Sequence, residues 1–215
     1  MVGPEPGALP RTKDLASGVV CIVASALATA GFAVLAARTA SRDAWPGRAG
    51  YIVAVSIYGA CLIFRFVMGA LSAFTDRRGA LLALEEAGTF FLPAGMLMPV
   101  AFSYFHGVTR WLTFSLAWAY AFGGFVLHLA LVGWFRRYAV SLGYAFFFVV
   151  LPALPGVRPA FGAEAFGWVF AGGGMFLVAL LFAGKDGFPY AHALWHAFSF
   201  GGVALSYVSL TLFLA

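Results

Sequence analysis

Seven runs of apolar residues, each about 20 residues long, constrain this 215-residue chain more than any other feature. A helix that rises about 1.5 Å per residue needs roughly 20 apolar residues to cross a bilayer core of about 30 Å. The runs predict membrane spans at residues 17–37, 51–75, 82–104, 111–133, 138–156, 164–184 and 188–214. The segments between them are short, so they leave no room for a soluble domain.

The composition supports the same class of protein. Hydrophobic residues make up 63% of the chain and charged residues only 10%, which excludes an ordinary soluble globular domain. The 26 glycines suit helices that pack closely in lipid. We therefore predict an all-α polytopic membrane protein, with a tail at residues 1–16 and a single seven-helix domain at residues 17–215. The first run is longer than the apolar core of a signal peptide, so we expect no cleavage there.

The basic residues orient the predicted bundle. Seven Lys and Arg residues fall on the N-terminal side of the seven spans and five on the other side, which favours a cytoplasmic N-terminus under the positive-inside rule. The net charge of +5 is then a property of the loops, and we expect no nucleic-acid partner. Cys21 and Cys61 lie inside apolar runs, so a structural disulfide is not expected.

A small set of polar side chains lies inside the predicted spans, where such groups are costly and are candidates for function. It comprises Arg65, Glu85, Glu86, His128, His192 and His196. Counted from the neighbouring loops at about 1.5 Å per residue, these residues can share one layer near the N-terminal side of the membrane. Because the chain is predicted to span the membrane, the expected partner is the lipid bilayer.

His192 and His196 give the sharpest local signal. Their spacing of four places both imidazoles on one helix face, where they can converge on one zinc ion. Glu85 or Glu86 could supply the third ligand or the general base of a hydrolytic site. The alternative is that the histidines hydrogen-bond to neighbouring helices and that a glutamate pairs with Arg65.

His128 is a weaker candidate. Its depth permits it to be a metal ligand, but hydrogen bonding between helices is the more common role of such a histidine. Together with His192 or His196 it could also supply the axial ligands of a haem.

The last span resembles the seventh helix of the hemolysin III family, the bacterial relatives of the progestin and adiponectin receptors. Residues 188–198, FPYAHALWHAF, show the family's proline-aromatic lead-in followed by His-x-x-Trp-His. Residues 84–95, LEEAGTFFLPAG, followed by Pro99, are similar to the third helix of the family. Comparable elements follow in order at Tyr58-Gly59-Ala60, Arg136-Arg137, Gly143-Tyr144 and Gly172-Gly173-Gly174.

The resemblance implies a seven-helix bundle of the bacterial inner membrane with a zinc site near the cytoplasmic face. In related members one histidine of helix two and two of helix seven hold the zinc, and an aspartate of helix three lies near the metal-bound water. The superfamily includes alkaline ceramidases, so the resemblance implies hydrolysis of a lipid amide or ester as a possible activity and a lipid as a possible substrate.

This sequence departs from the family at several site positions. The Ser-x-x-x-His motif of helix two falls on Gly69 and Ala73, or on Ser72 and Asp76 after a shift of three. The aspartate of helix three becomes Glu85, and the histidine after it becomes Glu86. The helix-one motif Glu-x-x-Asn-x-x-x-His survives at best as Asp14, Ser17 and Cys21.

Two explanations fit these changes. In a rebuilt site, Glu85 or Glu86 replaces the lost histidine and completes a zinc centre with His192 and His196. Of the two we expect Glu85 to be the third ligand or the general base, and Glu86 to form a supporting pair with Arg65 at the catalytic site. In a decayed site the metal is lost, Arg65 neutralises a glutamate, and the protein is a non-catalytic receptor-like or accessory subunit. A third possibility is membrane permeabilisation, but polar residues confined to one leaflet do not favour a pore.

Overall fold

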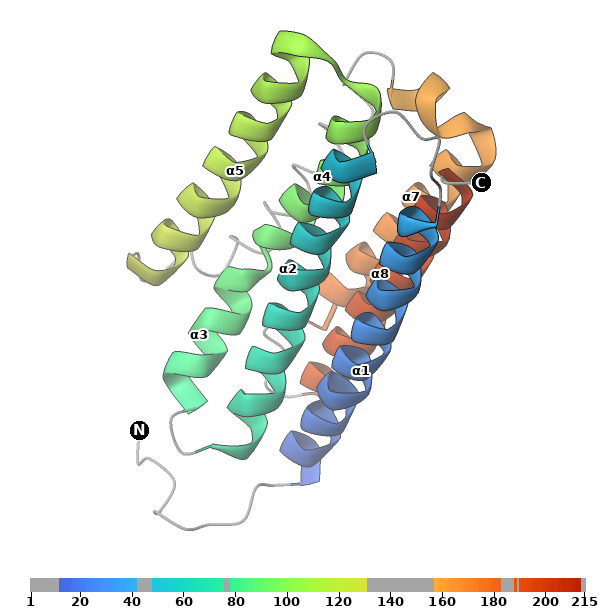
Figure 1. The fold of residues 1–215 in the computed structure, drawn as a ribbon. Coiled ribbons are helices and arrows are strands. Elements are labelled where there is room, and N and C mark those ends of the chain that lie inside the picture. Colours follow the sequence, from blue (N-terminus) through green and yellow to red (C-terminus); the bar gives the residue numbers. More distant parts are fainter. Residues whose placement is uncertain are drawn as a thin grey trace.

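The computed structural model describes residues 12–41, 48–75, 78–130, 157–182, 188 and 190–213 (Figure 1). Its regular elements in these ranges are all helices. They are α1 (Thr12–Ala40), α2 (Arg48–Phe74), α3 (Arg78–Gly88), α4 (Phe91–Tyr104), α5 (Gly107–Ala130), α7 (Val157–Leu180) and α8 (Ala191–Phe213).

Six of the predicted membrane spans correspond to helices in the described residues. Six stretches are long and apolar enough to cross a bilayer, and α3 and α4 together form one of them. This agrees with the prediction of an all-α integral membrane protein. The predicted span at residues 138–156 lies outside the described residues, so seven helices stay a prediction. In Figure 1, α5 ends toward one end of the bundle and α7 begins at the other.

The helices lie lengthwise beside one another, and side-chain contacts define their directions. α1 and α8 are parallel, because Ser17 contacts His192 at one end and Gly31 lies against Tyr207 further along. α2 runs opposite to α1, since Gly18 packs against Phe74. α1, α3 and α8 therefore all begin at the same end of the bundle (Figure 1).

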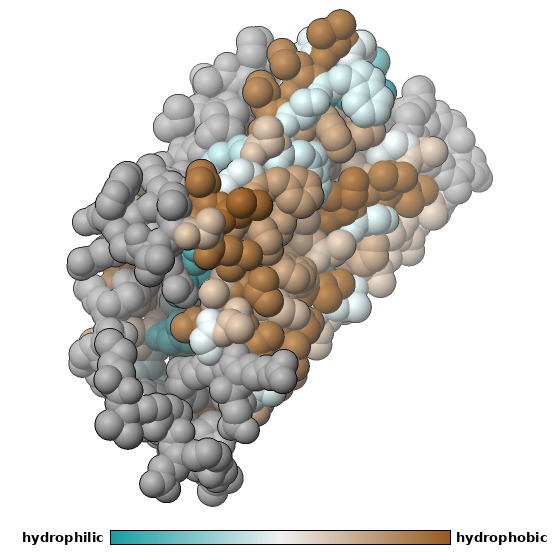
Figure 2. Space-filling model, turned by 90° about the vertical axis from the view of Figure 1, so that its left-hand side faces the viewer, coloured by the Kyte–Doolittle hydropathy of each residue, from teal (hydrophilic) through white to brown (hydrophobic). Residues whose placement is uncertain are grey.

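Apolar side chains form much of the outer surface. On the face shown in Figure 2, hydrophobic residues make up most of the surface that is not grey. Large apolar side chains are exposed along several helices, for example Val19 and Leu27 on α1 and Trp111 and Leu116 on α5. In water such surface would favour aggregation, whereas in a bilayer it faces hydrocarbon.

The predicted span at residues 82–104 is interrupted between α3 and α4. Pro93 has no backbone N–H, and its ring would clash with the carbonyl of Thr89, so an ideal helix cannot continue through this point. The backbone tightens before the proline: the N–H groups of Thr89, Phe90 and Leu92 donate to carbonyls three residues back. The break therefore lies one turn after Glu85.

Two glycines allow α7 and α8 to pack closely. A Cβ atom on Gly172 would lie 2.7 Å from the carbonyl oxygen of Gly202, and a Cβ on Gly202 would lie 2.8 Å from the carbonyl oxygen of Gly172. Both contacts involve backbone atoms, which cannot turn aside as a side chain can. Small residues at such crossings let helices associate in lipid.

We predict that Gly172→Ala destabilises the bundle by about 1–3 kcal/mol, because overpacking forces the two helices apart. Gly174→Ala is the matched control on the same helix, since a Cβ there meets nothing within 4 Å. Thermal unfolding in detergent measures the effect. Equal melting temperatures for the two variants would contradict the close crossing.

Candidate metal centre

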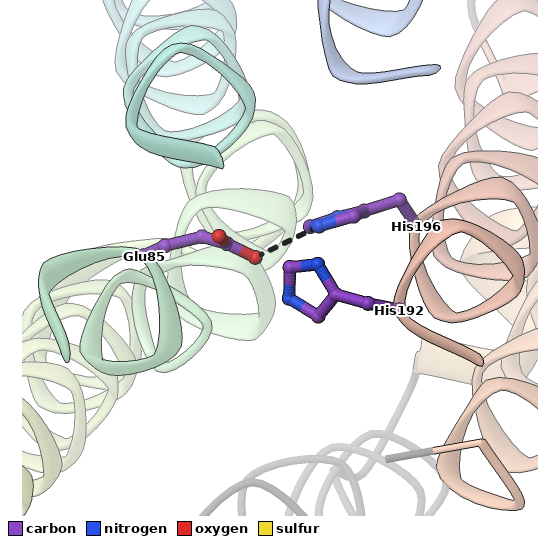
Figure 3. Close-up of side chains that lie close together, drawn as sticks. All are labelled: Glu85, His192 and His196. Atoms are coloured by element: carbon purple, nitrogen blue, oxygen red, sulfur yellow. Dashed lines mark ion pairs between the residues drawn. The ribbon is translucent and has the colours of Figure 1, made fainter. Parts of the chain in front are cut away.

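The common starting end of α3 and α8 brings three predicted site residues together. Glu85 comes from α3, and His192 and His196 come from the first turns of α8. One ligand atom from each lies within 4.8 Å of the others, and Nε2 of His196 is 3.2 Å from Oε1 of Glu85. Figure 3 shows the carboxylate pointing toward both imidazoles. Among the described residues, this group could hold a metal ion.

Glu85 reaches this position across the interior of the bundle. α3 packs against α2 and α5, whereas α8 packs against α7 and α1. The contact between α3 and α8 is therefore made by side chains. A glutamate is one methylene longer than the aspartate that the family resemblance implies, so it can reach further toward the histidines.

The donor atoms of the group fit a zinc ion. His196 is fully buried; its Nδ1 has no hydrogen-bond partner in the described part of the chain, and its Nε2 lies 3.2 Å from the Glu85 carboxylate without hydrogen-bond geometry. An orphaned buried nitrogen is costly unless another group satisfies it. Two imidazoles and one carboxylate are a known zinc ligand set, and ligand atoms around tetrahedral zinc lie roughly 3.4 Å apart. Small movements of the side chains would achieve this spacing.

Ser17 of α1 orients His192. Its hydroxyl oxygen lies 2.8 Å from Nδ1 of His192, and the serine is buried. When Nδ1–H donates to the hydroxyl, Nε2 is left unprotonated and can bind a metal. From the sequence, Ser17 was identified only as a position of the helix-one motif and had no assigned role, because serines in membrane helices commonly bond to their own backbone. Ser25 on the same helix does so, donating to the carbonyl of Cys21.

Gly69 of α2 makes room for the Glu85 carboxylate. A Cβ at residue 69 would lie 3.2 Å from Oε2 of Glu85 and 2.8 Å from Sγ of Cys21. The hydroxyl of Ser72, one turn away, donates to the same carboxylate oxygen over 3.4 Å. Thus Gly69, at a position where the resemblance implies a serine, lies against the carboxylate.

Glu86 and His128 form a separate pair. Nε2 of His128 lies 3.2 Å from Oε2 of Glu86, and this contact joins α3 to α5. The histidine side chain is buried, whereas the Glu86 side chain is 34% exposed. Neither residue belongs to the group of Glu85, His192 and His196. The interpretation of His128 as a residue that links helices agrees with this contact.

Arg65 is buried in α2 beside the candidate metal centre. Its Nε donates to Oγ1 of Thr89 over 3.3 Å, and its guanidinium carbon lies 5.5 Å from the ring centre of Trp195. Thr89 was not among the predicted site residues. Thr89 belongs to no motif with a recognisable spacing, so this contact could not be predicted from the sequence. The predicted pairing of Arg65 with a glutamate stays a prediction.

Comparison with known proteins gives two curated relatives. The chain is 23% identical over 164 residues to "Hemolysin-3" of Bacillus cereus, covering 75% of each chain. It is 23% identical over 161 residues to "Hemolysin-3 homolog" of Bacillus subtilis (strain 168), covering 74% of this chain and 76% of the relative. The chain is a divergent relative of the hemolysin III proteins. No family model matches it, and no solved structure matches it.

The relationship confirms the resemblance that the third and last spans carry. The Glu85 carboxylate lies against Gly69, where the resemblance implies the serine of the helix-two motif, and it reaches His196. A carboxylate from α3 therefore lies beside the part of α2 that carries the zinc-binding motif in related members. This arrangement is consistent with a rebuilt site.

We predict that Ser17→Ala weakens zinc binding by about 10- to 100-fold, the usual effect of losing a group that orients a ligating histidine. Ser25→Ala is the matched control, since its hydroxyl bonds within α1. Competition with a fluorescent zinc chelator measures both affinities. Equal zinc affinities of the two variants would show that Ser17 does not orient His192 for metal binding.

Proposed function

We propose that this hemolysin III relative is a zinc-dependent hydrolase of lipid amides or esters in the bacterial inner membrane, with its N-terminal tail, residues 1–16, in the cytoplasm. The observation that carries the proposal is the buried group of Glu85, His192 and His196, whose ligand atoms converge within 4.8 Å. Polar groups at this depth are expensive, and a metal would satisfy the ring nitrogen of His196 that faces Glu85.

Each residue of the group has a role in this proposal. His192 and His196 hold the metal, and Glu85 is the third ligand through Oε1, while its Oε2 accepts the hydrogen bond from Ser72. When bound, zinc supplies a Lewis acid that polarises a carbonyl group and activates water. Three protein ligands leave a fourth position open, as in hydrolytic zinc sites.

Glu86 and His128 form an acid–base pair at the same end of the bundle as the metal group. Glu86 follows Glu85 in the chain, and its side chain is partly exposed while its carboxylate contacts buried His128. We assign to this pair the transfer of the proton that water loses on attacking the carbonyl group to the leaving amine or alcohol. The exposed side of Glu86 also allows this pair to exchange a proton with the solvent.

An apolar cavity supports an acyl lipid as the substrate. It has a volume of about 270 Å³ and lies between α1, α2 and α8. Leu62 and Phe200, which line it, lie one helical turn from Phe66 and His196. A cavity with this lining would accept a hydrocarbon chain at a short distance from the metal group.

A non-catalytic role is the alternative. The 3.2 Å contact between Glu85 and His196 is also what a structural pair would make if it held α3 to α8 without a metal. In that case the protein is a receptor-like or accessory subunit.

We predict one zinc ion per chain in protein purified without chelators, and its loss in the His192→Ala/His196→Ala double variant. Elemental analysis measures the content. His106→Ala is the matched control, because His106 is exposed beyond the far end of α4. Zinc retained in the double variant would overturn the ligand assignment, and zinc absent from wild type would favour the structural pair.

We also predict turnover of a short-chain fluorescent ceramide by the detergent-solubilised protein, reduced at least 100-fold in Glu85→Gln, because the neutral amide is a weaker zinc ligand than the carboxylate. Release of the labelled fatty acid is the measurement. Full activity in Glu85→Gln would remove this residue from the mechanism. Inactivity of wild type on amide and ester substrates alike would contradict the enzymatic proposal.

A further inference from the structure

Arg65 is a buried cation whose hydrogen bonds are incomplete. Only 1% of the residue is exposed, although it lies inside a predicted membrane span. Its Nε donates to Thr89, but its Nη1 has no hydrogen-bond partner among the described residues. A guanidinium at such depth is expensive, and a bare donor adds to the cost. An anionic oxygen at Nη1 would offset both penalties.

The surroundings place the guanidinium beside the candidate metal centre. Thr89, which accepts its Nε–H, lies one turn after Glu85 on the α3 side. Trp195, whose ring it faces at 5.5 Å, immediately precedes His196 on α8. Within α2, Arg65 is one turn from Gly69, which touches the Glu85 carboxylate. Arg65 therefore lies between the same helices that Glu85 and the histidines bridge.

Aromatic rings fix the position of the guanidinium. Its central carbon lies 5.2 Å from the ring centre of Phe66 and 5.5 Å from that of Trp195. Such rings attract a cation through their faces but give no hydrogen bond to its N–H groups. The group is thereby held in place while a donor stays available for a ligand.

The charge of the site points to the sign of that ligand. Two neutral histidines, one carboxylate and one guanidinium sum to zero, so a divalent metal leaves the site with two positive charges. The remaining carboxylate nearby, Glu86, contacts His128 instead. In a medium of low dielectric constant, uncompensated charge of this size favours binding of an anion.

We propose that Arg65 is the oxyanion-binding residue of this site and that it holds an oxygen of the carboxyl group of an acyl lipid. The ligand is the carboxylate of the released fatty acid, and the same contact stabilises the negative charge that develops on that oxygen during hydrolysis. The acyl chemistry rests on the proposed function. Binding of a carboxylate by Arg65 requires neither bound metal nor turnover.

The test is equilibrium binding of three radiolabelled ligands with the same chain: octanoate, octyl phosphate and octanol. Wild type, Arg65→Met, Arg65→Lys and Arg110→Met are compared in bilayer discs of zwitterionic lipid, with chelator and with zinc. Arg110→Met is the matched control. Arg110 lies on α5 at the other end of the bundle, where its guanidinium faces the Phe102 ring at 5.9 Å and its Nε donates to the Phe105 carbonyl.

We expect wild type and Arg110→Met to bind octanoate more tightly than octanol. The preference is larger with zinc than with chelator, because the metal adds two positive charges to the site, whereas without it the unpaired donor of Arg65 alone favours the carboxylate. In Arg65→Met the affinity for octanoate falls by about tenfold or more, while that for octanol is unchanged. Arg65→Lys keeps the charge but loses the planar arrangement of N–H donors, so its affinity for octanoate lies between those of wild type and Arg65→Met. Because Arg65→Lys retains the buried charge, it tests the contact even if Arg65→Met fails to fold.

Three results would overturn the proposal. They are equal affinity for octanoate and octanol in wild type, unchanged octanoate binding in both Arg65 variants, and binding of octyl phosphate much tighter than that of octanoate, which would indicate a phospholipid headgroup. Octanoate binding that depends on Arg65, in a protein without zinc or turnover, would refute the proposed hydrolase and leave this inference standing. Zinc and turnover without such binding would refute this inference alone.

Discussion

The contact between Glu85 and His196 is the interaction around which the polar interior of this protein is arranged. It joins α3 to α8, two helices whose other packing partners differ. The remaining polar groups support its two ends: Ser72 donates to the carboxylate, and Ser17 orients the neighbouring His192. In a bilayer these groups have no water as a hydrogen-bond partner, so the position of each side chain limits the positions that its neighbours can take.

Much of the fold follows from the sequence, because the bilayer imposes a length and a polarity on every span. The apolar runs predicted the six candidate spans of the described residues, and counting along them predicted that the polar side chains share one layer. They did not reveal the break between α3 and α4. A run of apolar residues measures hydrophobicity, whereas the break depends on the ring of Pro93 and the carbonyl of Thr89. A proline alone does not decide where a helix ends, since Pro99 lies inside α4.

The candidate site, too, could be predicted from the sequence only in part. The spacing of His192 and His196 and the depth of Glu85 predicted that these residues could meet, and the structure brings them together. Depth alone does not distinguish Glu85 from Glu86, because they are neighbours on a helix. Glu85 was the expected ligand, and Glu86 was expected beside Arg65, whereas the structure places Glu86 against His128. The helix rotates successive residues by about 100°, so one glutamate faces the histidines and the other faces His128 on α5. Which glutamate takes which side depends on the rotation of α3.

The fit between Gly69 and Glu85 has a consequence for how this bundle can respond to its ligand. A histidine on α2 would place a metal bond on an unbroken helix of 27 residues. The carboxylate instead belongs to α3, an element of 11 residues that ends at the break before α4. A ligand bound at the carboxylate would therefore act on a short helix that ends one turn later. A glutamate of α3 in place of a histidine of α2 would exchange a nitrogen ligand for an oxygen ligand and would move that ligand from a long helix to a short one.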